Sequence, residues 1–137
     1  MKLRDAFLAV AKSRETERDV ATRQVVEAYL ASFESGDVQG RLALFAVDAR
    51  FEDPVGTPPI EGHDGLLVFW GQGTGMNISM KLERLSVNGP EAAFVFTATL
   101  SSAGAGEVVM RVIETMMLNE QGRISRMRAY FDVGSIG

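Results

Sequence analysis

The sequence FEDPVG, residues 51–56, places a carboxylate directly before a proline at the expected end of a strand. Side chains alternate between the two faces of a strand, so Phe51 and Asp53 share one face and Glu52 lies on the other. Pro54 has no N–H to donate and should end the strand pairing. A carboxylate held beside apolar side chains suits a general base. The alternative is an ordinary turn carboxylate, because Asp-Pro turns are common, and this stretch alone leaves both readings open.

Composition limits the class of protein. The chain has 137 residues, of which 46% are hydrophobic and 23% are charged, as in a single globular domain with a substantial core. Its net charge of −4 argues against a general affinity for nucleic acid or anionic membranes. The absence of cysteine excludes disulfides, thiolate metal sites and a cysteine nucleophile, and we expect a cytoplasmic protein. No apolar run approaches the roughly 20 residues that cross a bilayer.

The first part of the chain predicts helices. Residues 1–18 are expected to form a helical N-terminal extension, and residues 19–137 a single domain. A long helix is predicted over residues 16–35, because apolar side chains recur there at spacings of three and four. Its apolar stripe comprises Val25, Val26, Tyr29, Leu30 and Phe33.

Three shorter elements are predicted after the long helix. A second helix over residues 38–46 should bury three apolar side chains, Val38, Leu42 and Phe45. A short strand over residues 48–53 then carries Asp53, and a third helix begins near His63. Since His63 is the only histidine of the chain, neither a histidine metal site nor a Ser-His relay is expected.

The second half of the chain predicts a sheet. Alternating apolar residues indicate four antiparallel strands, over residues 78–87, 94–100, 107–118 and 126–131. The parity of the apolar positions changes within the first of these strands, which predicts a bulge near Glu83 and Arg84. Helices followed by strands are typical of an α+β domain in which the helices pack on one face of a curved sheet.

The strand over residues 107–118 carries a carboxyl group on its more apolar face. Its even-numbered positions are Val108, Met110, Val112, Glu114, Met116 and Leu118. If this face packs inward, Glu114 lies among hydrophobic side chains and should stay protonated or find a partner. The odd-numbered face is mixed, and inward packing of that face, with Glu114 in solvent, is the open alternative.

Three polar side chains are therefore expected on apolar faces of three separate elements: Tyr29, Asp53 and Glu114. A buried tyrosine alone is more often a core residue with a satisfied hydroxyl than a catalyst. Together, the three groups would supply an ionised base and two neutral hydrogen-bond donors. Such a set can move a proton next to a carbonyl, because the base takes the proton while the donors stabilise the oxygen that gains negative charge.

At these residues the chain resembles the bacterial Δ5-3-ketosteroid isomerases, within the superfamily of nuclear transport factor 2-like and SnoaL-like proteins. The resemblance runs from about residue 25 to residue 131. Its markers are VVxxY at 25–29, GD at 36–37 with LFA at 44–46, EDPVG at 52–56, EAAF at 91–94 and MRAxF at 127–131.

The resemblance implies a cone-shaped curved antiparallel sheet with three helices packed on its concave face, the cystatin-like arrangement. It makes Tyr29 the tyrosine of the oxyanion hole and Asp53 the base that carries a proton from C4 to C6 of a steroid. Glu114 falls where the family has a protonated aspartic acid as the second donor. The substrate is expected to contact Trp70, Phe131, Val112 and Met116. The resemblance also implies no cofactor, no metal, a homodimer and a small apolar substrate, without nucleic-acid or membrane partners.

The expected activity is that of an isomerase which conjugates the double bond of 3-oxo-Δ5-steroids through a dienolate. Two alternatives stay open, since fold alone does not fix function. One is another small-molecule enzyme on the same cone, such as a polyketide cyclase or a dehydratase. The other is a non-catalytic module that binds hydrophobic ligands. The chain departs from the family pattern at Glu114, which is one methylene longer than aspartic acid, and at Trp70, which replaces a tyrosine.

Overall fold

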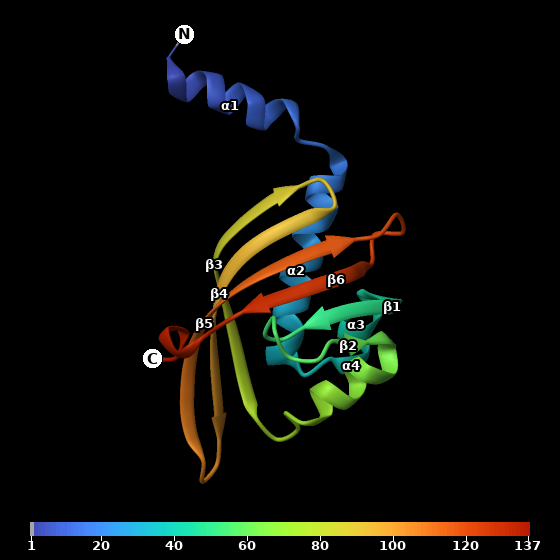
Figure 1. Cartoon of the computed structure of the whole chain (residues 1–137), viewed down its shortest axis with the longest axis vertical. Coiled ribbons are helices and arrows are strands. Elements are labelled where there is room, and N and C mark those ends of the chain that lie inside the picture. Colours follow the sequence, from blue (N-terminus) through green and yellow to red (C-terminus); the bar gives the residue numbers. More distant parts are fainter. Residues whose placement is uncertain (1) are drawn as a thin grey trace.

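The computed structural model describes residues 2–137 as an α+β fold built on one curved sheet (Figure 1). The elements are α1 (Leu3–Ser13), α2 (Glu17–Ser35), α3 (Val38–Ala43), β1 (Phe45–Glu52), β2 (Ile60–Glu61), α4 (Gly62–Gly71), β3 (Asn77–Asn88), β4 (Glu91–Ser102), β5 (Gly106–Leu118), β6 (Ile124–Tyr130) and the 3₁₀ turn η1 (Val133–Ser135). The six strands lie in the order β2-β1-β6-β5-β4-β3. All neighbouring pairs are antiparallel except β1 and β6, which run parallel.

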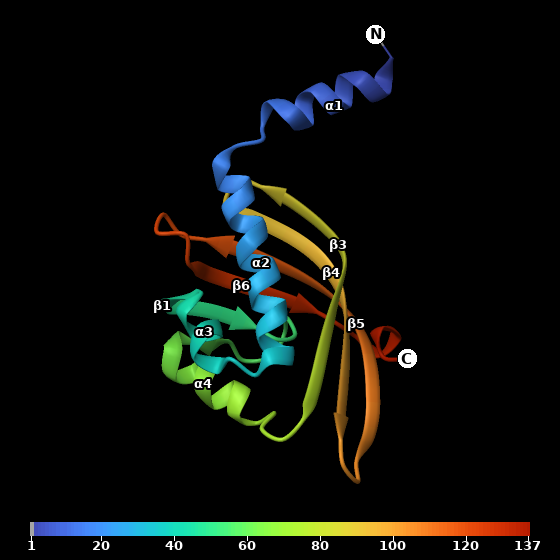
Figure 2. The ribbon, with the colours of Figure 1, turned by 180° about the vertical axis from the view of Figure 1, so that it is seen from behind.

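Helix α2 lies across the concave side of the sheet (Figure 2). A capping box between Thr16 and Asp19 starts it, and Gly36, with a φ of 70°, ends it in a left-handed conformation that glycine adopts without strain. The N-terminal part is tied to the turn between β3 and β4. There, the Thr22 hydroxyl donates to the carbonyl of Gly89 at 2.7 Å, and Asp19 accepts from the N–H of Gly89 at 2.6 Å. These bonds fix which face of α2 meets the sheet.

The predicted strand parity is confirmed. In β5 the even-numbered residues from Val112 to Leu118 are buried, and in β6 Met127 and Ala129 are fully buried. The pairing of β3 with β4 shifts register between Leu82 and Arg84, where the change of parity predicts a bulge. A bulge increases the local twist of a strand, so it helps to bend the long strands around the helices.

The predicted boundary between the second helix and the first strand is wrong. Helix α3 ends at Ala43 instead of continuing to residue 46, and β1 already begins at Phe45. The cause is long-range pairing: Phe45 lies opposite Ile124 of β6, and the Ile124 N–H donates to the carbonyl of Leu44 at 2.8 Å. Val38, expected to be buried, is 37% exposed.

The N-terminal helix α1 projects away from the rest of the chain (Figure 1). No residue of α1 is buried, although its apolar side chains include Leu3, Phe7 and Val10. Within the described residues 2–137, no helix is both long and apolar enough to cross a membrane.

Candidate active site

A cavity of about 580 Å³ opens between the concave face of the sheet and the helices. Its walls come from α2, α3, α4 and the strands β3, β4 and β5, with the residue after β1, the segment between α4 and β3, and the residue after β6. The lining is mostly apolar, and Tyr29, Asp53 and Glu114 all contribute to it. The fold thus brings together in one cavity the three polar side chains that the sequence places on separate elements.

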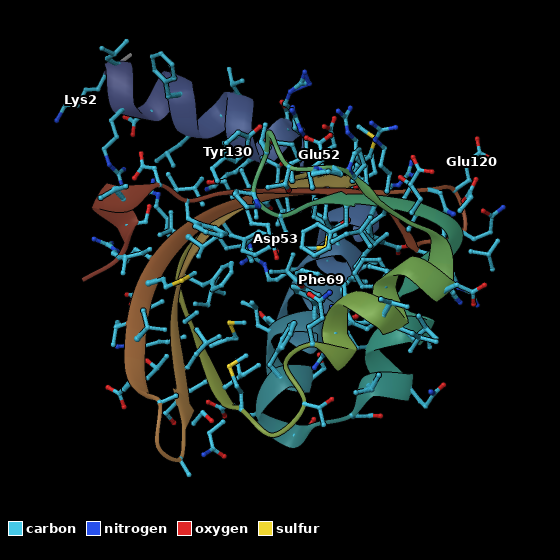
Figure 3. All side chains as sticks on the ribbon, turned by 60° about the horizontal axis from the view of Figure 1, so that its bottom comes forward. Lys2, Glu52, Asp53, Phe69, Glu120 and Tyr130 are labelled. Carbon is cyan, nitrogen blue, oxygen red and sulfur yellow. The ribbon has the colours of Figure 1, made fainter. Side chains whose placement is uncertain are left out.

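Asp53 reaches the cavity because it follows the last residue of β1. Phe51, two positions earlier on the same face, is fully buried and its ring lies edge-on to that of Phe69, with centroids 5.9 Å apart. Asp53 and Phe69 lie on the helix side of the sheet, whereas Glu52 points to the outer side (Figure 3). Burial raises the pKa of Asp53 from its ordinary value of 3.8 to about 6. The group is therefore ionised at neutral pH and more basic than an exposed aspartate.

Glu114 lies in the middle of β5 with only 2% of its surface exposed. Burial, assisted by the negative charge of Asp53, raises its pKa well above the ordinary value. Its Oε1 atom is buried and has no hydrogen-bond partner among residues 2–137. A carboxyl group that keeps its proton can donate a hydrogen bond, and buried polar atoms without a partner are rare and costly. Glu114 is thus a neutral hydrogen-bond donor, and a ligand atom can supply the partner that its Oε1 lacks.

Tyr29 lies on the buried face of α2 and is 3% exposed. Its ring packs edge-on against Phe33 and Phe45, with centroid distances of 5.2 and 5.8 Å. Burial raises the pKa of its hydroxyl well above 10, and the acidic side chains of Glu114 and Asp53 act in the same direction, whereas Arg41 opposes them. The hydroxyl therefore stays protonated at neutral pH and is held by its aromatic neighbours.

Three of the four predicted substrate-contact residues line the cavity: Trp70, Val112 and Phe131. Met116 does not, and this prediction is corrected. It is 2% exposed and lies two positions beyond Glu114 on the same face of β5, where it pairs with Ala92 and Met127 in the core. The strand face that lines the cavity at Val112 therefore continues into the packed core after Glu114.

Arg41 of α3 is a cavity residue that the sequence reading missed. Its side chain is buried, and its guanidinium lies over the ring of Phe33, with Cζ 3.6 Å from the ring centroid. A signal was available, because Arg41 follows Val38 by three residues and so shares a helix face with it. Because arginine side chains are mostly exposed, a charged residue in a short helix is expected to face solvent, and this spacing was not used.

The cavity offers acid–base groups but no cluster of metal ligands. Among residues 2–137, no three His, Cys, Asp or Glu side chains are arranged to hold a metal ion. The one histidine, His63, lies in the first turn of α4 and its Nε2 is 2.9 Å from the carbonyl oxygen of Phe45. The wall thus holds an ionised carboxylate, that of Asp53, in the same cavity as the protonated side chains of Tyr29 and Glu114.

Comparison with known proteins agrees with this fold. The solved structure of RV0760c from Mycobacterium tuberculosis, in complex with estradiol-17beta-hemisuccinate, superposes with a TM-score of 0.79 at 21% identity, over 85% of this chain and 98% of that one. The epoxide hydrolase/cyclase-like enzyme SalBIII gives a TM-score of 0.78 at 22% identity, over 85% and 94% of the two chains. At these identities the likeness shows the fold alone.

Sequence comparison is more specific. A Steroid Delta-isomerase from Nocardioides simplex is 32% identical over 114 residues, which cover 83% of this chain and 92% of that protein. The SnoaL-like domain family matches residues 26–127, a span that includes Tyr29, Asp53 and Glu114. The chain therefore belongs to the SnoaL-like domain family, as its resemblance to the ketosteroid isomerases predicts.

Proposed function

We propose that this protein is an isomerase that moves a β,γ double bond into conjugation with the ketone of a 3-oxo-Δ5-steroid. The observation that carries the proposal is the different chemical state of three groups in one cavity. Asp53, with a pKa of about 6, is ionised at neutral pH, whereas Glu114 and Tyr29 keep their protons. The identity of 32% to a relative named Steroid Delta-isomerase supports the same reading.

The reaction begins with the Asp53 carboxylate, which removes a proton from C4, the carbon between the carbonyl carbon and the double bond. The electron pair of that C–H bond moves toward the carbonyl, and the ketone becomes a dienolate. Asp53 then returns the proton to C6, and the double bond is left conjugated with the re-formed ketone. No atom is gained or lost, and the base ends in its starting state.

The dienolate oxygen receives hydrogen bonds from the Tyr29 hydroxyl and the protonated Glu114 carboxyl. Donors that are fixed in a water-poor cavity stabilise a developing oxyanion without reorganising, and each one typically contributes about 10²–10³ in rate. The free Oε1 of Glu114 supports this role, because a ligand oxygen would complete its hydrogen bonding. This division between one base and two donors is the one known for ketosteroid isomerases.

The rest of the cavity wall is formed mostly by apolar side chains. Trp70, Val112 and Phe131 contact the cavity, and its volume of about 580 Å³ is within the range of small-molecule pockets. A flat fused-ring ligand matches a lining of this kind, since its faces need no hydrogen bonds. The apolar lining also excludes water, which strengthens the interactions of the dienolate with its donors.

The test is to add 5-androstene-3,17-dione to the purified protein and to follow the absorbance of the conjugated enone. The proposal expects enone formation that depends on protein concentration and is inhibited by a planar phenolic steroid. A polyketide cyclase or dehydratase would share the pocket without conjugating this ketone. A binding module would take up the steroid and return it unchanged, and either result would contradict the proposal.

We also propose that the outer face of the sheet forms the contact of a homodimer. Three large apolar side chains are exposed there, Ile113, Met117 and Tyr130. Exposed apolar side chains grouped on one face often mark an interaction surface. Light scattering after size-exclusion chromatography should give twice the mass of 14.9 kDa, and Ile113→Asp should shift the protein to the monomer. A monomeric parent protein would contradict this part of the proposal.

A further inference from the structure

The steps proposed above do not use Arg41, although its side chain is part of the cavity wall. Arg41 lies in α3 and is only 4% exposed. Its guanidinium lies over two aromatic rings, with Cζ 3.6 Å from the centroid of Phe33 and 4.8 Å from that of Trp70. The flat guanidinium group is therefore held in a fixed orientation, because aromatic faces favour a stacked cation.

Among residues 2–137, Arg41 donates hydrogen bonds to one residue, Ser32. Its Nε donates to the Ser32 hydroxyl at 2.8 Å, and its Nη2 donates to the Ser32 carbonyl at 3.1 Å. A guanidinium carries five N–H donors, so these two bonds leave most of its donating capacity unused. Both bonds go to a residue of α2, and Arg41 is also part of the cavity wall, so its remaining N–H groups are available to a ligand there.

Among residues 2–137, no carboxylate lies within ion-pair distance of the Arg41 guanidinium. Within residues 2–137, every ion pair involves Arg50, Arg126 or Arg128. The nearby Asp37 favours the charged form of Arg41 from beyond ion-pair distance, while its carboxylate accepts the N–H of Gly40 at 2.8 Å as the cap of α3. A buried charge without a carboxylate in direct contact is costly, and contacts with aromatic rings offset only part of that cost. The missing partner of this guanidinium is best supplied from outside the chain.

The charges of the cavity wall indicate where an anionic ligand group would bind. Among the described residues that line it, Arg41 is the one cation, and Asp53 and Glu114 are the acids. An anionic ligand group would be repelled by Asp53 and attracted to Arg41. The cavity thus has one position that favours a negative charge, and this position is set on the helix wall, apart from the sheet residue Glu114.

We propose that Arg41 is a specificity-determining residue that binds a carboxylate on the substrate, so that the chain acts on an acidic unsaturated ketone. That the substrate is an unsaturated ketone rests on the proposed function, whereas its carboxylate is inferred from Arg41 alone. A carboxylate fits because its two oxygens match the parallel N–H groups of a guanidinium. A substrate of this class lies with its ketone oxygen at Tyr29 and Glu114 and its acid group at Arg41.

The test compares hydroxynaphthoic acids with their methyl esters by isothermal titration calorimetry at pH 7.5. The phenol of each probe occupies the oxyanion donors, and the 3-, 6- and 7-hydroxy isomers of 2-naphthoic acid set the carboxylate at different distances from it. Each ester has nearly the shape of its acid without the charge. The proposal expects at least one acid to bind the parent protein about tenfold or more tighter than its ester.

The variant Arg41→Met replaces arginine with an unbranched apolar side chain and so removes the positive charge. It should abolish the preference for the acid while changing the affinity for the ester less than about threefold. Arg41→Lys keeps the charge without the fork of N–H groups, so it should retain only part of the preference. This second variant keeps the test open if Arg41→Met does not fold.

Two results would overturn the inference. The first is that all three acids bind the parent more weakly than their esters. The second is that Arg41→Met weakens acid and ester equally, which would mean that Arg41 only joins α2 to α3 through Ser32. A protein that prefers the acids but leaves 5-androstene-3,17-dione unchanged would support the carboxylate site and count against the proposed steroid reaction.

Discussion

The substitution Asp53→Asn should stabilise the fold at neutral pH while it abolishes isomerase activity. In the folded chain the pKa of Asp53 is raised from 3.8 to about 6, because burial disfavours the carboxylate. The folded protein therefore binds a proton that the unfolded chain has released, and stability is lost as pH rises from about 4 through 6. A difference of about two pKa units corresponds to about 3 kcal/mol. Asparagine carries no charge to desolvate, so the variant avoids this loss.

The expected gain in the free energy of unfolding is about 1 to 3 kcal/mol at pH 7.5, because water in the cavity reduces the cost of the charge. At pH 4 the gain should be near zero. Urea unfolding followed by the fluorescence of Trp70, the only tryptophan, measures it at both pH values and at one protein concentration. The matched control is Asp48→Asn, which changes an exposed carboxylate of β1, the strand that ends just before Asp53. If Asp53→Asn gains no more stability between pH 4 and 7.5 than the control, Asp53 is solvated and the reasoning is refuted.

Three further predictions concern the donors, the pH dependence and the N-terminus. Glu114→Ala should lower turnover by about 10²–10³-fold, and Glu114→Gln should lower it less because an amide still donates a hydrogen bond. Equal turnover in the parent and both variants would rule out a donor role for Glu114. The value of kcat/KM should rise with pH around a midpoint near 6, because only the ionised Asp53 accepts a proton, and a flat profile from pH 4.5 to 8 would contradict this. Deletion of residues 2–14 should leave the thermal midpoint unchanged within about 2 °C, as α1 buries no side chain, and a chain that no longer folds would place the domain boundary elsewhere.

Elements whose side-chain pattern reflects a single buried face could be predicted from the sequence. The even-numbered face of β5, including Glu114, follows from strand alternation, and it is the buried face in the structure. The bulge near Glu83 follows from the same rule, because a change of parity requires an extra residue. The family resemblance adds the cone shape, which alternation alone does not provide.

Features that depend on distant partners could not be predicted. The start of β1 at Phe45 is set by its parallel pairing with Ile124, which lies almost 80 residues later in the chain. The loss of Met116 from the cavity wall has a similar cause, since it depends on how far the core extends along β5. Arg41 was missed because its burial comes from rings on α2 and α4, contributed by Phe33 and Trp70. The spacing of Val38 and Arg41 places both on one face of α3, but it does not identify the distant rings that cover Arg41.

The most direct test of the central claim is to follow deuterium from C4 to C6 of 5-androstene-3,17-dione in the parent protein and in Asp53→Asn. If one buried carboxylate carries the proton across the ring, the parent forms the conjugated enone with part of the deuterium at C6, and the variant forms it at least about 10²-fold more slowly. Formation of the enone at equal rates in both proteins, or no enone from the parent, would contradict the account.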